Sequence, residues 1–315
     1  MRALSPVNRP PAPPFCGIIR AKANEIAEWL GFWFRSQQFA DWRRSQARGA
    51  NIQNLRFSQI EHIEIPVPRL PEQHRIAAIL TEQMAAVAKA RAGADEQLEA
   101  ARALPAAYLR AVFNSPEAQG WPKKRLDEVS EVLNGFGFRE DMQGRTDLPF
   151  PFIKVSDMNA AGSQIVVHRA ANTADHAILK LLRAKTYPRG TVIFPKVGGA
   201  LLTNKKRVLG VEATFDNNVM GIVPKGVECD WVYLWMLTVD LRDLANTQAL
   251  PSIRQTQVGG MQIPLPPVQQ RREIAAQLSE QMAGVDRLRK SLEEQLAEIK
   301  ALPAALLRRT FAGEL

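Results

Sequence analysis

Apolar side chains recur at seven-residue steps along the C-terminal segment of the chain. The residues at these steps are Leu278, Val285, Leu292, Ile299 and Leu306. A second apolar position lies between them, occupied by Ile274, Leu288 and Leu302 and interrupted by Gln281 and Gln295. Two apolar positions per heptad are typical of a helix that packs on another helix along a coiled-coil seam. The pattern therefore predicts one long helix whose apolar stripe is covered by a partner helix.

A segment with the same pattern lies earlier in the chain. Residues 65–117 align with residues 263–315 without a gap, at an offset of 198 residues, and 24 of the 53 aligned positions are identical. Each copy opens on an I-P-x-P segment, whose two prolines keep the backbone extended. The first copy keeps the frame with smaller residues, namely Ile76, Leu80, Val87, Ala90, Ala94, Ala101, Leu104 and Tyr108.

The repeat predicts how the two helices are arranged. We expect two helices of about 38 residues to pair as one rod, antiparallel or nearly so. Pro105 and Pro303 occupy matching positions in the two copies, and a proline inside a helix removes a hydrogen bond and clashes with the preceding turn. We therefore expect both helices to bend or break there. The alternative is a pair of ordinary amphipathic helices within one globular core.

The repeat extends upstream of both helices, but only in part. Residues 15–64 are a degenerate copy of about 219–262 once a four-residue insertion is allowed, whereas no other segment copies residues 121–218. We therefore expect the N-terminal region to hold only the back half of a domain, with a closing helix near 25–41 and an exit strand into Ile65. Lacking the front half, this region should expose Trp29, Trp33, Phe34 and Phe39 more than the complete domain exposes Trp231, Trp235 and Leu241, unless another chain covers them.

Residues 121–262 have the pattern of a complete domain. Short β-like runs at 150–155, 164–167, 191–197 and 219–223 are bounded by Gly, Pro, Asn and Asp, and 231–244 reads as an amphipathic helix. The predicted fold class is α+β: a β-rich domain, a partial second domain, and two long helices paired as an antiparallel coiled coil. The predicted domains are 1–64, 65–120, 121–262 and 263–315.

Composition and charge narrow the functional class. The chain has 315 residues, 46% of them hydrophobic and 23% charged, which is ordinary for a globular protein. Apolar runs of membrane-spanning length are absent from the sequence, and Cys16 and Cys229 lack metal-ligand spacing, so a reducing cytoplasm is the expected location. The four histidines are scattered, and the sequence shows no phosphate-binding glycine loop and no H-E-x-x-H motif. Catalysis by this chain is therefore not expected.

The positive charge lies outside the predicted helices. The net charge is +9, with +4 on residues 1–64, 0 on 65–120, +4 on 121–262 and +1 on 263–315. Because the predicted helices are nearly neutral, we expect them to act as spacers. We expect the intervening segments, which carry most of the positive charge, to contact a polyanion. An alternative of a different class is a non-enzymatic coiled-coil scaffold whose globular parts bind other proteins.

The sequence resembles the specificity subunit of Type I restriction–modification systems along nearly its whole length. The resemblance rests on I-P-x-P-x-x-x-[EQ]-[QR]-x-x-I-A before a long helix, twice, and on the phrases at 151–158 and 190–198. It implies that 121–262 is the second of two target-recognition domains that read a split DNA site. It also implies that the helices hold the domains apart and dock methyltransferase subunits, which a motor–nuclease subunit joins. The chain departs from the family at its front, where either the chain start is truncated or another polypeptide supplies the missing half.

The resemblance implies that this chain holds no cofactor, whereas its partner subunits use S-adenosylmethionine, ATP and Mg. The residue types suited to DNA contact in 121–262 are amides, cations, loop aromatics and loop glycines. The candidates are Asn134, Phe136, Phe138, Arg139, Lys154, Lys196, Gly198, Gly199, Asn204, Lys205, Lys206, Arg207 and Arg254. The alternative for each cation is a solvated surface charge, and for Phe136 and Phe138 a place in the core.

Overall fold

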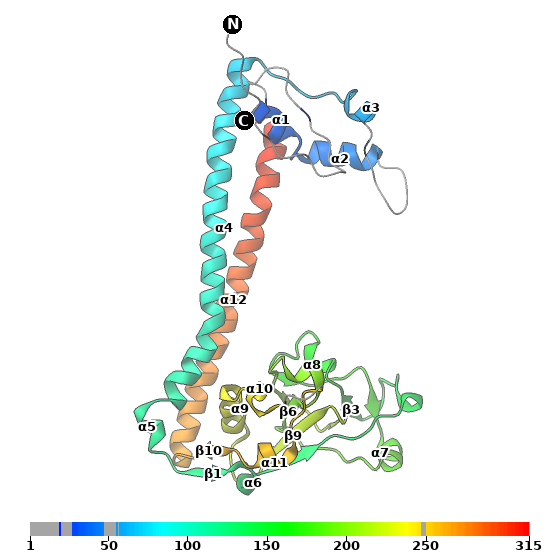
Figure 1. Cartoon of the computed structure of the whole chain (residues 1–315), viewed down its shortest axis with the longest axis vertical. Coiled ribbons are helices and arrows are strands. Elements are labelled where there is room, and N and C mark those ends of the chain that lie inside the picture. The colour runs from blue at the N-terminus through cyan, green and yellow to red at the C-terminus, as the bar shows by residue number, and fades with distance from the viewer. Residues whose placement is uncertain (1–18, 20–26, 47–54, 56, 247–249, 315) are drawn as a thin grey trace. The chain divides into compact units, whose positions relative to one another are not determined.

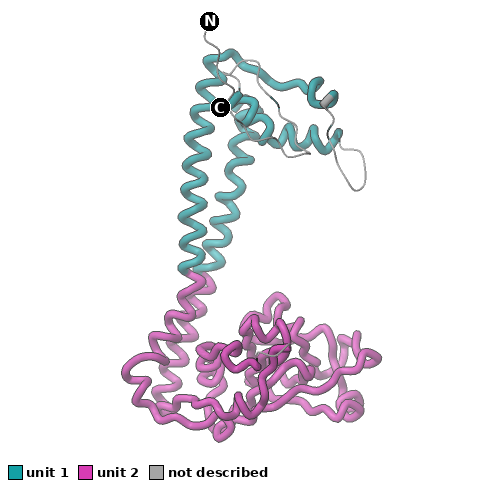
Figure 2. The backbone as a smooth tube through the Cα atoms, in the orientation of Figure 1, with its two compact units in different colours: residues 1–100, 288–315 teal, residues 101–287 magenta. Residues whose placement is uncertain are grey.

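The chain is described by a computed structural model, which covers all residues except 1–18, 20–26, 47–54, 56, 247–249 and 315. It divides into two compact units, and the divisions fall inside the two longest helices (Figure 2). Unit 1 comprises residues 1–100 and 288–315, and unit 2 comprises residues 101–287.

The two long helices are α4 (Leu70–Phe113) and α12 (Val268–Phe311), each of 44 residues (Figure 1). In unit 1, Leu80 near the start of α4 shares a buried cluster with Leu307 near the end of α12. In unit 2, Leu109 near the end of α4 shares one with Leu278 near the start of α12. The helices therefore pair antiparallel, and the predicted coiled coil is confirmed.

Neither proline breaks its helix, so of the two expected outcomes, a bend or a break, the break is excluded. Pro105 lies inside α4 and Pro303 inside α12. The turn after each proline is held by burial, since Leu109 and Leu307 are both in the core. These apolar contacts offset the cost of about 3 kcal/mol that a proline imposes on a helix interior.

The seam on α12 uses one of the two predicted apolar positions. Leu278, Val285 and Leu292 are buried as expected. The second buried position, however, falls one residue later than predicted, at Ala275 and Leu296, and Leu288 and Leu302 are 45% and 44% exposed. A shift of one residue turns a side chain by about 100° around a helix, so Leu288 and Leu302 lie outside the seam.

The described part of unit 2 contains ten strands in three small sheets. The sheet orders are β2–β9–β6–β7–β4, β5–β3–β8 and β1–β10. The strands are β1 (Lys123–Arg125), β2 (Ser130–Asn134), β3 (Phe150–Ile153), β4 (Val166–Val167), β5 (Thr173–Ala174), β6 (Val192–Pro195), β7 (Arg207–Leu209), β8 (Thr214–Phe215), β9 (Val219–Pro224) and β10 (Gln262–Pro264). Neighbouring strands are antiparallel except in the pairs β3–β8 and β4–β7, which are parallel. The predicted α+β class is confirmed for this unit.

The five-stranded sheet of unit 2 has a core on each face, because successive side chains of a strand point to opposite faces. Val192 and Phe194 of β6 join one core, which also holds Trp231 and Val232. Ile193, between them, joins the other core. The short helical segments of unit 2 are α5 (Pro116–Gln119), α6 (Leu126–Val129), η2 (Glu140–Met142), η3 (Asp157–Asn159), α7 (His176–Leu182), α8 (Gly198–Leu201), α9 (Cys229–Thr238), α10 (Leu241–Leu244) and α11 (Gln255–Gly259).

Unit 1 adds α1 (Ala27–Trp33), α2 (Gln37–Gln46) and α3 (Phe57–Ile60) to the ends of the long helices. These three occupy the places in the repeat that α9, α10 and α11 occupy in unit 2. The indole of Trp29 donates to Pro66 O over 2.8 Å. The indole of Trp231 donates to Pro264 O over the same distance, 2.8 Å. The upstream extension of the repeat is therefore present in three dimensions.

The ends of the long helices repeat a second contact. In unit 1, Phe311 of α12 lies 5.0 Å from Trp29 between ring centroids. In unit 2, Phe113 of α4 lies 5.1 Å from Trp231. We call the indole, its proline carbonyl and the phenylalanine of the helix end the aromatic anchor; each unit has one.

Two expectations for unit 1 are wrong. Trp29 and Trp33 are only 2% and 3% exposed, because Trp29 packs among the ends of α4 and α12 and Trp33 packs against Phe34 and Phe39. Phe34 and Phe39 are half-buried, and are therefore more exposed than Trp231, Trp235 and Leu241, as expected. The expected strand into Ile65 is also missing, since residues 63–65 are extended without forming a strand. Among the described helices, none is long and apolar enough to cross a membrane.

Candidate nucleic-acid interface

Three polar side chains meet where β2, β6 and α11 adjoin in unit 2. Asn134 ends β2, and its Oδ1 accepts a hydrogen bond from Lys196 Nζ over 2.7 Å. Its Nδ2 donates to Gln255 Oε1 over 2.9 Å, and Gln255 Nε2 donates to the carbonyl of Val132 over 2.6 Å. We call Asn134, Lys196 and Gln255 the amide cluster. Asn134 and Gln255 are exposed, so this cluster presents amide donors and acceptors to solvent beside one cation.

The backbone around the amide cluster is tightly constrained. A Cβ on Gly135 would lie 2.0 Å from Asp216 O, so no side chain fits where the chain leaves β2. Gly198 has a φ of +68° and donates its N–H to Pro251 O over 2.7 Å. Gly199, which follows it, is exposed with open space around its Cα. The loop after β6 therefore leaves room for close backbone approach at Gly199.

The cation of the amide cluster, Lys196, has a pKa below the ordinary value of a lysine. Burial lowers the pKa of Lys196, and the charge of Asp216 opposes that shift. The same burial raises the pKa of Asp216. Arg254, next to Gln255, is exposed, and the backbone N–H of Arg254 donates to Gln257 Oε1 over 2.9 Å.

The aromatic candidates lie in the core. Phe138 stacks on Phe152 with ring centroids 3.8 Å apart, and Phe136 stacks on Tyr187 at 6.2 Å. Both candidates are half-buried. These rings support the loop after β2 from beneath, and stacking on a base would require them to leave those contacts.

The cations near these rings, Lys154 and Arg139, already have polar partners within the chain. Lys154 Nζ lies 5.7 Å from the Phe138 ring centroid and donates to Gln143 Oε1 over 2.6 Å. Arg139 is exposed and pairs with Asp141 over 2.7 Å. An exposed ion pair contributes little stability, so Arg139 exchanges partners at small cost.

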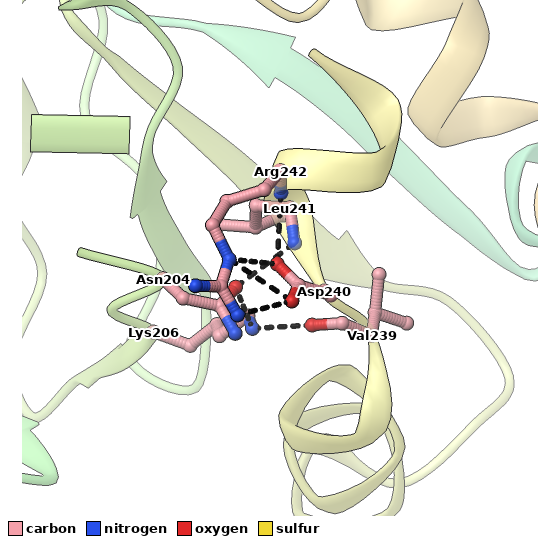
Figure 3. Close-up of polar contacts among 6 residues, drawn as sticks. All are labelled: Asn204, Lys206, Val239, Asp240, Leu241 and Arg242. Atoms are coloured by element: carbon pink, nitrogen blue, oxygen red, sulfur yellow. Dashed lines mark hydrogen bonds and ion pairs between the residues drawn. The ribbon is translucent and has the colours of Figure 1, made fainter. Parts of the chain in front are cut away.

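The basic loop 203–207 holds one fully buried cation, Lys206, between two half-buried ones, Lys205 and Arg207. Lys206 is 2% exposed and its Nζ donates to Asn204 Oδ1 over 2.7 Å and to Val239 O over 2.5 Å (Figure 3). Asn204 has a φ of +55° and also accepts from Leu241 N over 2.9 Å. Burial lowers the pKa of Lys206 to about 8. Lys206 and Asn204 thus fasten the loop to the connection between α9 and α10, and burial removes Lys206 from the DNA-contact candidates.

The neighbours of Lys206 point elsewhere. Lys205 Nζ bonds to Asn159 Oδ1. Arg207 is half-buried and donates to Met158 O over 3.2 Å and to Lys206 O over 2.8 Å. Burial lowers the pKa of Arg207. Of the three adjacent cations, Lys205 is the one best placed to meet a ligand.

The predicted residues therefore form three groups. One is the amide cluster with Gly198, Gly199 and Arg254; the second joins Phe136, Phe138, Arg139 and Lys154; the third is the loop from Asn204 to Arg207. Sequence reasoning missed Gln255, Gln143 and Asn159, which complete the polar contacts of these groups. Nothing in the local sequence distinguishes these amides from other surface amides.

A β-rich domain that presents amides and cations on loops, carried on paired helices, belongs to the class of recognition proteins. The chain belongs to the Type I restriction modification DNA specificity family, whose domain profile matches residues 15–99 and 118–298. This confirms the resemblance inferred from the repeated helices, and with it the assignment as a DNA specificity protein.

Two relatives show how much of the chain the likeness spans. The chain is 22% identical over 324 residues to the Type I restriction enzyme EcoKI specificity subunit of Escherichia coli K12, covering 96% of this chain and 68% of that protein. It is 22% identical over 325 residues to the StySPI specificity subunit of Salmonella potsdam, with the same shares covered. The chain thus spans about two thirds of the length of these relatives.

Solved structures share the fold. A chain from a structure on complex assembly and conformational transition of the type I R-M system superposes with a TM-score of 0.77 at 22% identity, covering 91% of this chain and 71% of that one. The HsdS subunit from Thermoanaerobacter tengcongensis gives a TM-score of 0.57 at 22% identity, with 91% and 70% covered. Both confirm the α+β fold with paired helices.

Proposed function

We propose that residues 121–262 read one half of a split DNA site through the amide cluster, Arg254 and Lys205, and that the chain itself carries no catalytic group. The observation that carries this is the amide cluster, where exposed amides and a cation meet at the ends of two strands. An amide side chain can bond both N6 and N7 of adenine in the major groove. Lysine and arginine beside it suit phosphate oxygens.

The first test separates phosphate contact from base reading. Each phosphate neutralised by a cation adds roughly −0.9 to the slope of log K against log salt concentration. We expect Lys205→Ala with Arg254→Ala to flatten that slope by about 1.8, measured by fluorescence anisotropy on duplex DNA. Lys89→Ala, which removes an exposed cation from α4, is the control and should leave the slope unchanged. An unaltered slope in the double variant would remove these cations from the interface.

The second test concerns sequence choice. Asn134→Ala and Gln255→Ala should leave the salt slope intact and relax the choice of methylated sequence, because a lost bidentate base contact costs about 1–3 kcal/mol of discrimination. Methylation is followed by sequencing DNA after incubation of the chain with a cognate methyltransferase subunit. An unchanged methylated motif in both variants would place base reading elsewhere.

The long helices are proposed to dock the methyltransferase and motor–nuclease subunits. Leu288 and Leu302 support this, because both are exposed and, two heptads apart, they lie on the same side of α12. Large apolar side chains outside the seam suit a partner protein better than water.

Co-purification tests the docking proposal. Leu288→Ser with Leu302→Ser should reduce recovery of the methyltransferase subunit without lowering helix content. The matched control is Lys290→Ser with Lys300→Ser, which alters two exposed residues of the same helix. Equal recovery with both double variants would count against docking on this side of α12.

A further inference from the structure

The segment leading into α4 in unit 1 has the local structure of its counterpart in unit 2. Ile63 N donates to Ile60 O over 3.2 Å, and at the equivalent place Met261 N donates to Val258 O over 3.2 Å. Both turns follow a short helix, α3 or α11, and precede an extended I-P-x-P segment. Residues 60–67 therefore repeat the turn and the following I-P-x-P segment of residues 258–265.

The first turn of each long helix repeats a further bond. Gln73 Nε2 donates to Pro68 O over 2.7 Å. At the equivalent place Arg271 Nη1 donates to Pro266 O over 2.9 Å. The extended segment is thus fixed at its end as well as at its beginning in both units.

In unit 2 this extended segment is covered by strand β1. Lys124 pairs with Ile263 and Arg125 with Gln262 in an antiparallel register. The bonds at the two ends of the ladder are Leu126 N to Met261 O, 2.8 Å, and Leu265 N to Pro122 O, 2.7 Å. A basic strand, Lys123–Arg125, therefore completes the edge.

In unit 1 the corresponding edge carries no described strand. Residues 63–67 are extended, and no strand of the described chain pairs with them. Val67, the counterpart of Leu265, is 58% exposed. An exposed row of backbone donors and acceptors is a template for strand addition.

Two carboxylates make this edge suited to a basic strand. A Cβ on Gly259 would lie 3.0 Å from Asp127 Oδ2, and Asp127 is the carboxylate that pairs with Arg125 over 2.6 Å. The counterpart of Gly259 in unit 1 is Glu61, which is exposed. In unit 1, Glu61 therefore supplies a carboxylate close to the position that Asp127, the partner of Arg125, occupies in unit 2.

The second carboxylate is Glu64, the counterpart of Gln262, which faces Arg125 in the β1–β10 register. Glu64 also lines a cavity of about 390 Å³ together with Trp33, Trp42 and His62. The edge therefore offers open backbone groups, two acidic side chains and an adjoining hollow with aromatic walls.

We propose that residues 63–67 accept an extended basic strand from a second polypeptide, in the register in which β1 pairs with β10. The strand has the chemistry of residues 121–126, an aromatic residue and a proline followed by three cations and a leucine. This inference goes beyond the proposed function because it requires no DNA, so its test fails or succeeds independently of DNA binding.

The test uses the full chain and a fluorescent peptide of residues 118–126, with both ends blocked. We expect saturable binding, a fall in affinity as salt rises, and no saturable binding of a scrambled peptide of the same composition. Val67→Pro removes the N–H that matches the donor of Leu265, between two residues that are already proline. It should weaken the peptide about fivefold, the effect of one hydrogen bond, whereas Val67→Ala keeps the N–H and should bind as the parent chain does.

Charge is tested separately. Glu61→Lys with Glu64→Lys should abolish saturable binding, while circular dichroism shows an unchanged helix content. Absence of saturable binding at about 1 mM peptide, or equal binding by Val67→Pro and Val67→Ala, overturns the proposal. A concentration-dependent dimer of the chain that Val67→Pro dissolves would support the pairing and identify a second copy as the polypeptide that supplies the strand.

Discussion

Replacing the buried lysine of the basic loop by an apolar residue should change how the stability of unit 2 depends on pH. Lys206 Nζ has two neutral oxygen acceptors, Asn204 Oδ1 and Val239 O (Figure 3). The charges acting on it are Asp240, which raises its pKa, and Arg242, which lowers it. These two pair with each other over 2.5 Å, so their effects on Lys206 largely cancel and burial dominates.

The direction and size of the effect follow from proton linkage. The pKa of Lys206 falls from 10.5 to about 8 on folding. Between these values the unfolded chain binds more protons than the folded chain, so the free energy of unfolding rises with pH in that window. Below about pH 8 the full penalty of burying the charged ammonium is present. The gain from pH 8 to 10.5 is of the order of 3 kcal/mol, at about 1.4 kcal/mol per pKa unit.

The assay compares variants, because other groups titrate in the same range. Urea unfolding of the parent chain and of Lys206→Met is followed by tryptophan fluorescence and near-ultraviolet circular dichroism at several pH values from about 7 to 10.5. The parent should gain stability relative to Lys206→Met as pH rises. Lys205→Met, at the neighbouring and less buried position, should show the same pH dependence of the free energy of unfolding as the parent chain. Equal pH dependence of the parent and Lys206→Met would show that Lys206 is not held as a buried cation.

Three shorter predictions concern the packing. Leu292→Asp should cost several kcal/mol by burying an unpaired charge in the seam, whereas Leu288→Asp, at an exposed site on the same helix, should cost under about 1 kcal/mol; similar losses in thermal melts would contradict the seam. Trp231→Phe should cost about 1–3 kcal/mol by leaving Pro264 O without its donor, and an unchanged urea midpoint would show that water replaces it. Pro303→Ala should stabilise the chain by up to about 3 kcal/mol and so raise its melting temperature. A lowered melting temperature would mean that the proline shapes the seam.

The repeat was the most informative part of the sequence. It predicted the antiparallel helix pair and the back-half copy in unit 1, because identical residues at a fixed offset are constrained to similar packing. It could not choose the second seam position. Leu288 and Leu302 are larger and more apolar than the residues one position later, Arg289 and Pro303, yet the helix pairing leaves the leucines exposed.

The candidate site was less predictable for a physical reason. Lys205, Lys206 and Arg207 look alike in sequence, but the loop turns at Asn204 and enters β7 at Arg207, so only the middle cation is fully buried. The burial of Trp29 was missed because its covering surface comes from Leu307 and Phe311, far away in sequence. Composition could not show that the ends of the long helices cover the aromatic side chains of α1.

The two aromatic anchors are built in opposite chain order. In unit 2 the helix-end phenylalanine, Phe113, precedes Trp231, whereas in unit 1 the helix-end phenylalanine, Phe311, follows Trp29. The same contacts therefore form whichever of the two residues comes first in the chain. A circular permutant opened in the connection at 114–120 and joined beyond Phe311 to the segment before Trp29 would keep both anchors and both halves of the helix seam.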